Sequence, residues 1–408
     1  MSEAIAVSPH IHWIGINDRT TDLFEGMWPI SREGVSYNSY LVQGEKTALI
    51  DLAKSLKGED LLRQVDGLVP VANLDYIVIN HMEPDHTGVL SLFQSLAPRA
   101  TLICTEKAQA MLDSFYGIRE RIRVVHDGET LSLGGVQLQF FETPFVHWPE
   151  TMMTYEPESK VLFSCDGFGG FGAFEGAIFD EDYPSVDYYE REALRYYTNI
   201  VAKFSRMVLR AIDKLAAIPI RVIAPSHGLV WRKHPERILE LYKLWASYAL
   251  TPARPEVTLL YATMYGHTET MMNAVAHGVA STGTPLKIFN VADTHVSYIL
   301  PSLWTRRGVI VGAPTYEGHL FPTMAAALAV ADQKGVTGKQ AAYFGSFGWH
   351  GGAQAMFQKI VEPLKWEILD ALAFRGSPTR DTLKAGEEFG ARFARAITAS
   401  DHREESNE

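Results

Sequence analysis

Four side chains that could bind a metal stand within six consecutive residues, directly after an apolar run. The run is Leu74–Asn80, and the side chains are His81, Glu83, Asp85 and His86. Carboxylates and imidazoles crowded at the end of a strand interact unfavourably unless a cation lies between them. The sequence therefore predicts a metal site at this point.

Three more potential ligands, His147, Asp166 and His227, each follow an apolar run of their own. Taken alone, each has a structural interpretation: the histidine beside Trp148 could simply be hydrogen-bonded, and Asp–Gly is a common turn. Strand ends that meet at one rim could instead bring all seven side chains together. Such a set of nitrogen and oxygen ligands suits iron or manganese, although it does not exclude zinc.

The elements before residue 250 predict a mixed αββα sandwich. Short β-rich runs occur in pairs, such as Ser36–Val42 with Thr47–Asp51 and Met152–Tyr155 with Lys160–Ser164. Between such runs lie helical patterns, and we expect one long helix over residues 187–216. Sheets built from hairpins and covered by helices are typical of an α+β domain.

A domain boundary is expected at Thr251–Pro255, where two prolines interrupt the preceding helical pattern. We therefore place the first domain at residues 1–250 and the second at residues 256–400. The second domain alternates strand, loop and helix, as in Val257–Ala262 followed by Glu269–Ala280. This alternation predicts an α/β fold with a doubly wound parallel sheet.

Three loops of the second domain follow expected strands and could bind a cofactor. The first, at 263–268, offers hydroxyls and backbone N–H groups at a helix N-terminus, which favours a phosphate but is also an ordinary helix cap. The loops at 314–317 and 346–352 add aromatic surfaces and glycines that suit a planar ring, although Phe347 and Trp349 could merely pack on the surface. The candidate residues are Thr263, Met264, Tyr265, Gly266, His267, Thr268, Pro314, Thr315, Tyr316, Glu317, Ser346, Phe347, Gly348, Trp349, Gly351 and Gly352.

The pattern H-x-E-x-D-H at residues 81–86 resembles the metallo-β-lactamase fold, and specifically its flavodiiron branch. The hydrolytic branch has H-x-H-x-D-H, whereas Glu83 stands at the second position here. A carboxylate at this position makes the site harder and more anionic, which stabilises oxidised iron. The resemblance therefore implies a non-haem diiron centre with redox chemistry.

The resemblance also implies how the seven side chains divide between the metals. His81, Glu83 and His147 would hold one iron, and Asp166 would bridge the pair. The second iron would be held by Asp85, His86 and His227. Whether His86 binds iron is left open, because Asp85 and a water could complete that site.

The second domain resembles flavodoxin, and its three loops match those that hold the phosphate and ring of flavin mononucleotide (FMN). Two positions depart from the family pattern: His350, where serine is common, and Glu317, where asparagine is common. Glu317 near the ring would disfavour the anionic reduced flavin and so shift its potential.

The combined resemblance to flavodiiron proteins covers the whole chain and implies a reductive reaction. Reduced FMN would pass electrons to the diiron centre, which reduces O2 to water, nitric oxide to nitrous oxide, or both. A head-to-tail homodimer or dimer of dimers would bring the FMN of one chain to the irons of another. Phe24, Tyr37 and Trp148 could line the gas pocket, or serve only as core packing.

Composition limits the partners of the chain. A formal charge of −11 disfavours nucleic acid, and only two cysteines, Cys104 and Cys165, occur in 408 residues, which fits a reducing cytoplasm. No signal peptide and no membrane-spanning run is expected. We expect no appended rubredoxin or flavin-reductase module, so electrons would come from a separate donor such as rubredoxin or a reduced deazaflavin.

Two other interpretations use the same residues. One is a zinc-dependent metallo-β-lactamase-type hydrolase with an accessory flavodoxin domain, in which a metal-bound hydroxide attacks an ester. The other is an electron carrier with FMN and a vestigial metal site. The filled set of ligands disfavours the electron carrier.

Overall fold

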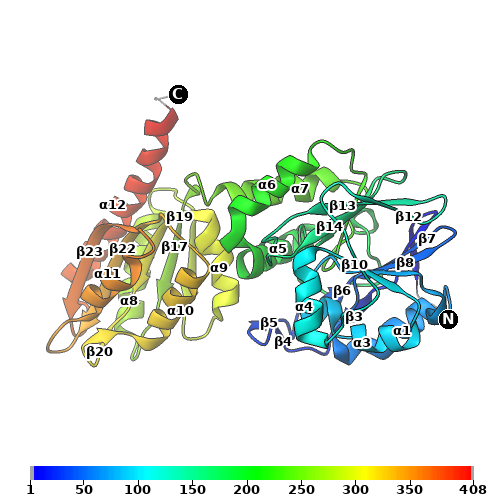
Figure 1. The fold of residues 1–408 in the computed structure, drawn as a ribbon. Helices are drawn as coiled ribbons and strands as arrows, with labels where there is room; N and C mark the ends of the chain where they lie inside the picture. Colours follow the sequence, from blue (N-terminus) through cyan, green and yellow to red (C-terminus); the bar gives the residue numbers. More distant parts are fainter. Residues whose placement is uncertain (1–3, 406–408) are drawn as a thin grey trace. The chain divides into compact units, whose positions relative to one another are not determined.

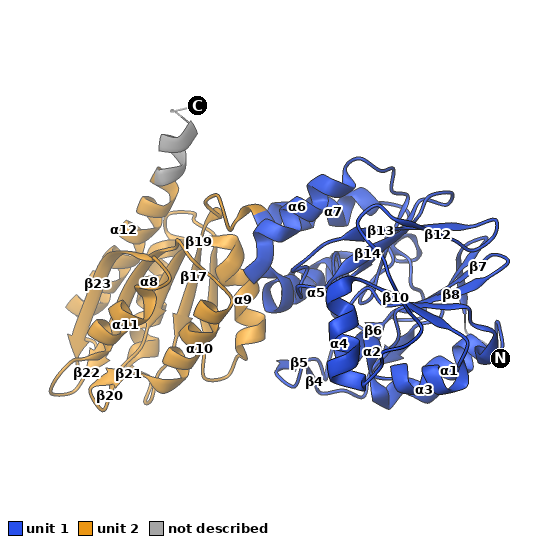
Figure 2. Ribbon diagram, in the orientation of Figure 1, with its two compact units in different colours: residues 1–246 blue, residues 247–408 orange. Residues whose placement is uncertain are grey.

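The structure is a computed structural model that describes the backbone of residues 4–405 and the side chains of residues 4–399. Its internal contacts divide the chain into two units, Met1–Ala246 and Ser247–Glu408 (Figure 2). Each unit contains its own sheets and helices.

Two sheets form the centre of unit 1. In pairing order, the first contains β1 (Ile5–Ser8), β2 (Ile11–Trp13), β7 (Tyr40–Gln43), β8 (Thr47–Ile50), β9 (Tyr76–Val78), β10 (Thr101–Cys104) and β11 (Ile122–Val124). The second contains β12 (Thr130–Ser132), β13 (Gln137–Glu142), β14 (Met152–Glu156), β15 (Val161–Cys165) and β16 (Val222–Pro225). Two small ribbons pair β3 (Ile16–Asp18) with β6 (Val35–Tyr37) and β4 (Leu23–Phe24) with β5 (Trp28–Pro29).

Helices cover the outer faces of the two sheets. In Figure 1, α6 and α7 lie on one side of the sheets of unit 1, and α1 and α3 lie on the other. The helices of this unit are α1 (Gly58–Asp66), α2 (Pro84–Thr87), α3 (Leu90–Leu96), α4 (Glu106–Tyr116), α5 (Asp187–Tyr196), α6 (Ser205–Leu215) and α7 (Pro235–Ser247). All residues of β14 and β15 are buried, as expected for strands covered on both faces. The predicted αββα sandwich is therefore confirmed.

The single long helix expected over residues 187–216 is wrong. The structure has α5, then a π-helical turn at Tyr197–Val201, a 3-10 turn at Ala202–Phe204, and α6. The side chains of Thr198 and Asn199 both donate to the carbonyl of Arg195, at 3.1 and 2.5 Å. Side chains that compete for a helix carbonyl loosen the regular ladder, and π turns are frequent at functional sites.

Unit 2 is a parallel sheet flanked by helices, as the sequence predicts. The strands pair in the order β18 (Leu286–Asn290), β17 (Arg254–Tyr261), β19 (Arg306–Gly312), β22 (Gln340–Phe347) and β23 (Glu367–Arg375), with a short hairpin of β20 (Thr315–Tyr316) and β21 (His319–Leu320). The helices are α8 (His267–Ala280), α9 (Val296–Thr305), α10 (Pro322–Gln333), α11 (Ala353–Val361) and α12 (Arg380–Glu405). This strand order is that of a doubly wound flavodoxin-like sheet, which binds ligands at the carboxyl ends of its strands.

Helices α8 and α12 pack with their backbones in contact. A Cβ atom on Gly278 would lie 1.9 Å from the carbonyl oxygen of Glu387, and one on Gly390 would lie 2.1 Å from that of Val275. Glycine at both positions therefore permits this close packing. In the part of the chain that the structure describes, neither α12 nor any other helix combines the length and apolarity needed to cross a bilayer.

Candidate functional site

The metal-ligand candidates of unit 1 all follow the ends of central strands. His81 and Glu83 come after β9, and Pro84 then occupies the first turn of α2, where its fixed φ favours a helix start. The short helix α2 carries Asp85 and His86. The remaining candidates are His147 in the turn between β13 and β14, Asp166 directly after β15, and His227 shortly after β16.

Four of these side chains form one group around a common point. The Nε2 atom of His147 lies 3.0 Å from Oε2 of Glu83 and 3.3 Å from Oδ2 of Asp166. The Nε2 atom of His81 lies 3.3 Å from the same Glu83 oxygen and 3.4 Å from the same Asp166 oxygen. This spacing suits the ligands of a single metal ion.

A second group lies on the other side of Asp166. The Nε2 atom of His86 lies 3.2 Å from Oδ1 of Asp166 and 3.5 Å from Oδ1 of Asp85. The Nε2 atom of His227 lies 3.4 Å from the same Asp166 oxygen and 3.3 Å from Oδ2 of Asp85. The two oxygens of Asp166 thus face two different groups of ligands. All seven side chains predicted from the sequence are brought together here.

Several polar atoms at this place are buried without a hydrogen-bond partner. These atoms are the two carboxylate oxygens of Asp85, Oδ2 of Asp166, and the Nε2 atoms of His86 and His227. Buried polar atoms are normally paired, because leaving one unpaired costs about 1–3 kcal/mol. Convergent unpaired lone pairs on carboxylates and imidazoles are what a pair of cations would satisfy, so the donor set fits a two-metal centre.

The charges around Asp166 shift the pKa values of the four histidines. Burial by itself lowers the pKa of each imidazole, but the neighbouring carboxylates, with Asp166 common to all four, outweigh it. The pKa rises to about 10 for His81 and His227 and to about 9 for His86 and His147. Burial would likewise raise the pKa of Asp166, but His86, His147 and His227 hold it well below its ordinary value.

The other ring nitrogens are fixed by groups outside the two sets of ligands. Nδ1 of His81 lies 2.7 Å from Oε1 of the buried Glu150, and Nδ1 of His227 lies 2.8 Å from the carbonyl oxygen of Ser36. Such contacts set the tautomer and direct Nε2 toward a metal. Glu150 was not predicted from the sequence, and its position three residues after His147 is the one available signal.

Replacing Glu150 by glutamine should weaken iron binding about tenfold, because partners of this kind typically contribute 10–100-fold to metal affinity. The variant keeps the shape of the side chain but removes the charge that faces His81. Iron affinity measured by competition with a chelator tests this. Glu158→Gln, at an exposed position, is the matched control, and equal affinities for the two variants would show that Glu150 does not support the site.

Aromatic side chains cover the imidazoles. The rings of Phe24 and Tyr37 lie 5.3 and 5.6 Å from that of His227, and the ring of Trp148 lies 5.0 Å from that of His81. The predicted pocket residues therefore do contact ligand candidates. Tyr196, which the sequence analysis missed, donates from its hydroxyl to Oδ1 of Asp166 at 2.8 Å.

The three predicted cofactor loops of unit 2 follow the carboxyl ends of β17, β19 and β22, which are adjacent in the sheet. In the first loop, Thr263 Oγ1 accepts from the N–H of Gly266, which has a φ of 87° and precedes α8. The hydroxyls of Thr268 and Ser346 lie 3.1 Å apart and join the first loop to the third. The second loop reaches the third at Gly352, where an added Cβ would lie 1.9 Å from the carbonyl oxygen of Gly318.

Large aromatic side chains of these loops are open to solvent. Tyr265 is 88% exposed and Trp349 81% exposed, and Met264 and Tyr316 are also exposed. Exposed apolar side chains that cluster around backbone N–H groups indicate a ligand surface more than core packing. Glu317 has a φ of 48°, in the left-handed region that asparagine adopts more readily than glutamate. The loops therefore fit a planar phosphorylated cofactor.

Comparisons with known proteins agree with both sites. Residues 35–228 match the family described as "ODP family beta lactamase", and residues 259–390 match "Flavodoxin". An anaerobic nitric oxide reductase flavorubredoxin of Pectobacterium carotovorum is 37% identical over 402 residues, covering 96% of this chain and 78% of the relative. The chain belongs to the flavodiiron proteins.

Solved structures of flavodiiron proteins share the fold. Rubredoxin oxygen:oxidoreductase from Desulfovibrio gigas superposes with a TM-score of 0.92 at 28% identity, covering 97% of this chain and 99% of that one. The flavodiiron protein of Giardia intestinalis gives the same TM-score and identity, with 98% of each chain covered. The predicted class, an oxidoreductase with FMN and a non-haem diiron centre, is confirmed, and a zinc hydrolase is not favoured.

Iron binding to this flavodiiron protein should weaken as the pH falls from about 9 to about 6. The raised histidine pKa values mean that the metal-free imidazoles are protonated below about 9, whereas a ligand must be neutral. Each proton that iron displaces then lowers its apparent affinity about tenfold per pH unit. Chelator competition across this range tests the slope, and an affinity independent of pH would contradict the proton balance.

Proposed function

We propose that the first domain, residues 1–250, holds the diiron centre and that the second, residues 256–400, holds FMN. One iron would be bound by His81, Glu83 and His147 and the other by Asp85, His86 and His227, with Asp166 between them. The spacing of both groups supports this division. The contact of each Asp166 oxygen with a different group is the observation that carries it.

The FMN phosphate is assigned to the first loop, Thr263–Thr268, whose backbone N–H groups lie at the N-terminus of helix α8. The isoalloxazine ring is assigned to the residues of the other two loops, Pro314–Glu317 and Ser346–Gly352. The exposure of Tyr316 and Trp349, one from each of these two loops, supports this, because a flat ring can stack on such surfaces.

The proposed reaction is reduction of O2 to water, of nitric oxide to nitrous oxide, or both. The names of the Pectobacterium and Desulfovibrio relatives mention these two gases. When bound, the irons supply redox equivalents and a place for the gas, and FMN supplies electrons. Both reductions consume electrons and protons in equal number, so the site must also manage protons.

The side chains around the centre bind, orient and shield it. Glu150 and the Ser36 carbonyl orient two imidazoles, and Phe24 and Tyr37 exclude water from the side of His227. Tyr196 holds a proton on its hydroxyl, where burial first and then the charge of Asp166 raise its pKa well above the ordinary value. That proton is held in a hydrogen bond to Asp166.

Parallel electrode assays test the substrate. Protein loaded with iron and FMN, and supplied with a chemically reduced donor, should consume O2 or nitric oxide without releasing peroxide. The ratio of the two rates identifies the preferred gas. Inertness toward both gases, combined with ester hydrolysis by the zinc-loaded form, would replace this proposal with a hydrolase.

We also propose that electrons arrive from a separate donor, a rubredoxin or a reduced deazaflavin, and that chains assemble head to tail as a homodimer or a dimer of dimers. The donor is supported by the name of the Desulfovibrio protein, and assembly by the exposed side chains of Tyr265 and Trp349. Light scattering during turnover tests the assembly, which a fully active monomer would contradict.

The two buried cysteines, Cys104 and Cys165, form no disulfide and support a reducing, cytoplasmic location.

A further inference from the structure

A cavity of about 350 Å³ lies in unit 2 at the edge of the sheet opposite the cofactor loops. Arg306, Gln340 and Glu367 are the first residues of β19, β22 and β23, so this edge carries the amino ends of the strands. The cofactor loops follow the carboxyl ends. The cavity is therefore separate from the proposed FMN site.

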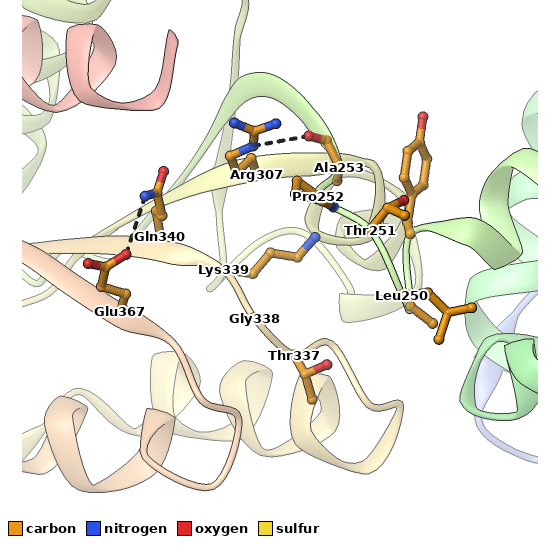
Figure 3. A pocket seen from close by; sticks show the side chains of 12 residues that line it. Leu250, Thr251, Pro252, Ala253, Arg307, Thr337, Gly338, Lys339, Gln340 and Glu367 are labelled. Carbon is orange, nitrogen blue, oxygen red and sulfur yellow. Dashed lines mark hydrogen bonds between the residues drawn. The ribbon is translucent and has the colours of Figure 1, made fainter. Parts of the chain in front are cut away.

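Two buried cations face this cavity. Lys339 is 5% exposed and Arg307 6% exposed, and both line the space together with the segment 248–253 that precedes β17 (Figure 3). Figure 3 shows the ammonium of Lys339 directed toward Thr251 and the guanidinium of Arg307 hydrogen-bonded to Ala253. Lysine is mostly exposed unless it is paired, so the burial of Lys339 beside a second cation needs a physical reason.

The Lys339 ammonium makes hydrogen bonds only to neutral groups among the described residues. It donates to the carbonyl oxygens of Trp304 and Arg306, each at 2.9 Å. An ammonium has three donors, so one N–H is left for another acceptor. The carboxylate that lines the cavity belongs to Glu367, which is exposed and accepts from Gln340 at 3.3 Å.

The missing counter-charge affects Lys339 directly. Burial lowers its pKa to about 7, and the positive charge of Arg307 acts in the same direction. A buried ammonium without a charged partner is unfavourable, and an anion in the cavity would relieve that cost for Lys339 and offset the repulsion from Arg307.

We propose that this cavity binds a small phosphate-bearing organic molecule, with Lys339 and Arg307 as its cationic contacts. An arginine fork beside a lysine point charge is a common pair of phosphate ligands in proteins. The cavity is larger than a phosphate alone requires. Its remaining wall, with Tyr248, Leu250 and Pro252, offers aromatic and apolar surface for an organic group.

Calorimetric titration of the full chain, loaded with iron and FMN, tests this proposal with inorganic phosphate as the probe. Chloride at equal ionic strength is the reference. Phosphate should bind, and Lys339→Met should weaken binding at least about tenfold, since hydrogen bonds to charged groups contribute at this level. Lys359→Met removes an exposed lysine that does not line the cavity, and should leave binding unchanged.

A second pair of variants separates binding from folding, because Lys339 also contacts carbonyls next to α9. Thr337 is exposed at the cavity. Thr337→Glu places a negative charge there and should weaken phosphate binding about fivefold, whereas Thr337→Gln should not. If phosphate binds no more strongly than chloride, the proposal is overturned. Equal binding by wild type, Lys339→Met and Thr337→Glu also overturns it, because the phosphate then binds elsewhere, such as at the metals.

Discussion

Replacing Asp166 by alanine should remove iron from the protein and lower gas reduction by on the order of 100-fold or more, since breaking a buried charge network costs about 3–5 kcal/mol. The carboxylate is 1% exposed and faces both groups of ligands. Without it, two histidines on each side lose their shared partner. Iron content and gas consumption of the purified variant measure the effect.

Asp166→Asn separates charge from packing, because the amide has the shape of the carboxylate and also keeps an acceptor for Tyr196. We expect it to lose iron nearly as fully as the alanine variant. Asp182→Ala removes an exposed carboxylate in the turn Asp180–Asp182, outside both groups of ligands, and should bind iron normally. Normal iron content and turnover in both Asp166 variants would show that this residue is not shared by two metals.

Replacing Gly352 by alanine should weaken FMN binding about 10–100-fold while iron content stays normal. The new Cβ would lie 1.9 Å from the carbonyl oxygen of Gly318, so the second and third loops could not keep their close contact. Overpacking of this kind costs about 1–3 kcal/mol, which corresponds to the stated loss of affinity. Flavin fluorescence titration measures the affinity, and donor-driven turnover should recover with excess FMN.

Gly351→Ala is the matched control. A Cβ at Gly351 meets no atom within 4 Å, and its φ lies outside the left-handed region. Gly351 belongs to the same loop, but its methyl group meets no atom of the second loop, so this variant should bind FMN at least about tenfold more tightly than Gly352→Ala. If both variants bound FMN equally well, the contact between the loops would have no part in holding the cofactor.

The sequence predicts the metal site well because four of its seven candidate ligands lie within six consecutive residues. His81, Glu83 and Asp85 alternate along the chain directly after β9, and no ordinary turn requires that combination. The parallel sheet of unit 2 is equally predictable, because each strand is followed by a glycine- or proline-containing loop and a helix. The sequence of neighbouring residues is therefore enough to predict both the metal site and the parallel sheet.

The supporting groups could not be predicted in this way. Glu150 reaches His81, and Tyr196 reaches Asp166, across contacts that depend on how the two sheets and α5 pack. The break in the helix after Tyr196 is similar, because Thr198 and Asn199 look like ordinary helical residues until their hydroxyl and amide groups are seen to bond to the backbone. Contacts between distant segments leave no pattern in a single sequence.

The cavity at Lys339 also could not be predicted from the sequence. A lysine before a strand is an unremarkable feature in a sequence, and its burial beside Arg307 follows only from the pairing of β19 with β22. The same pairing aligns the loops that follow these strands at the other edge of the sheet. The topology of the sheet therefore creates both the cavity and the cofactor site, but the local sequence predicts only the cofactor site.

Electron paramagnetic resonance of the partly reduced, iron-loaded protein is the most direct test of the central claim, that Asp166 joins two irons in one centre. We predict the signal of a spin-coupled mixed-valent iron pair, integrating to about one spin per chain and lost in Asp166→Ala. A signal from isolated ferric ions, or a protein that takes up zinc and shows no coupled signal after iron loading, would contradict the account.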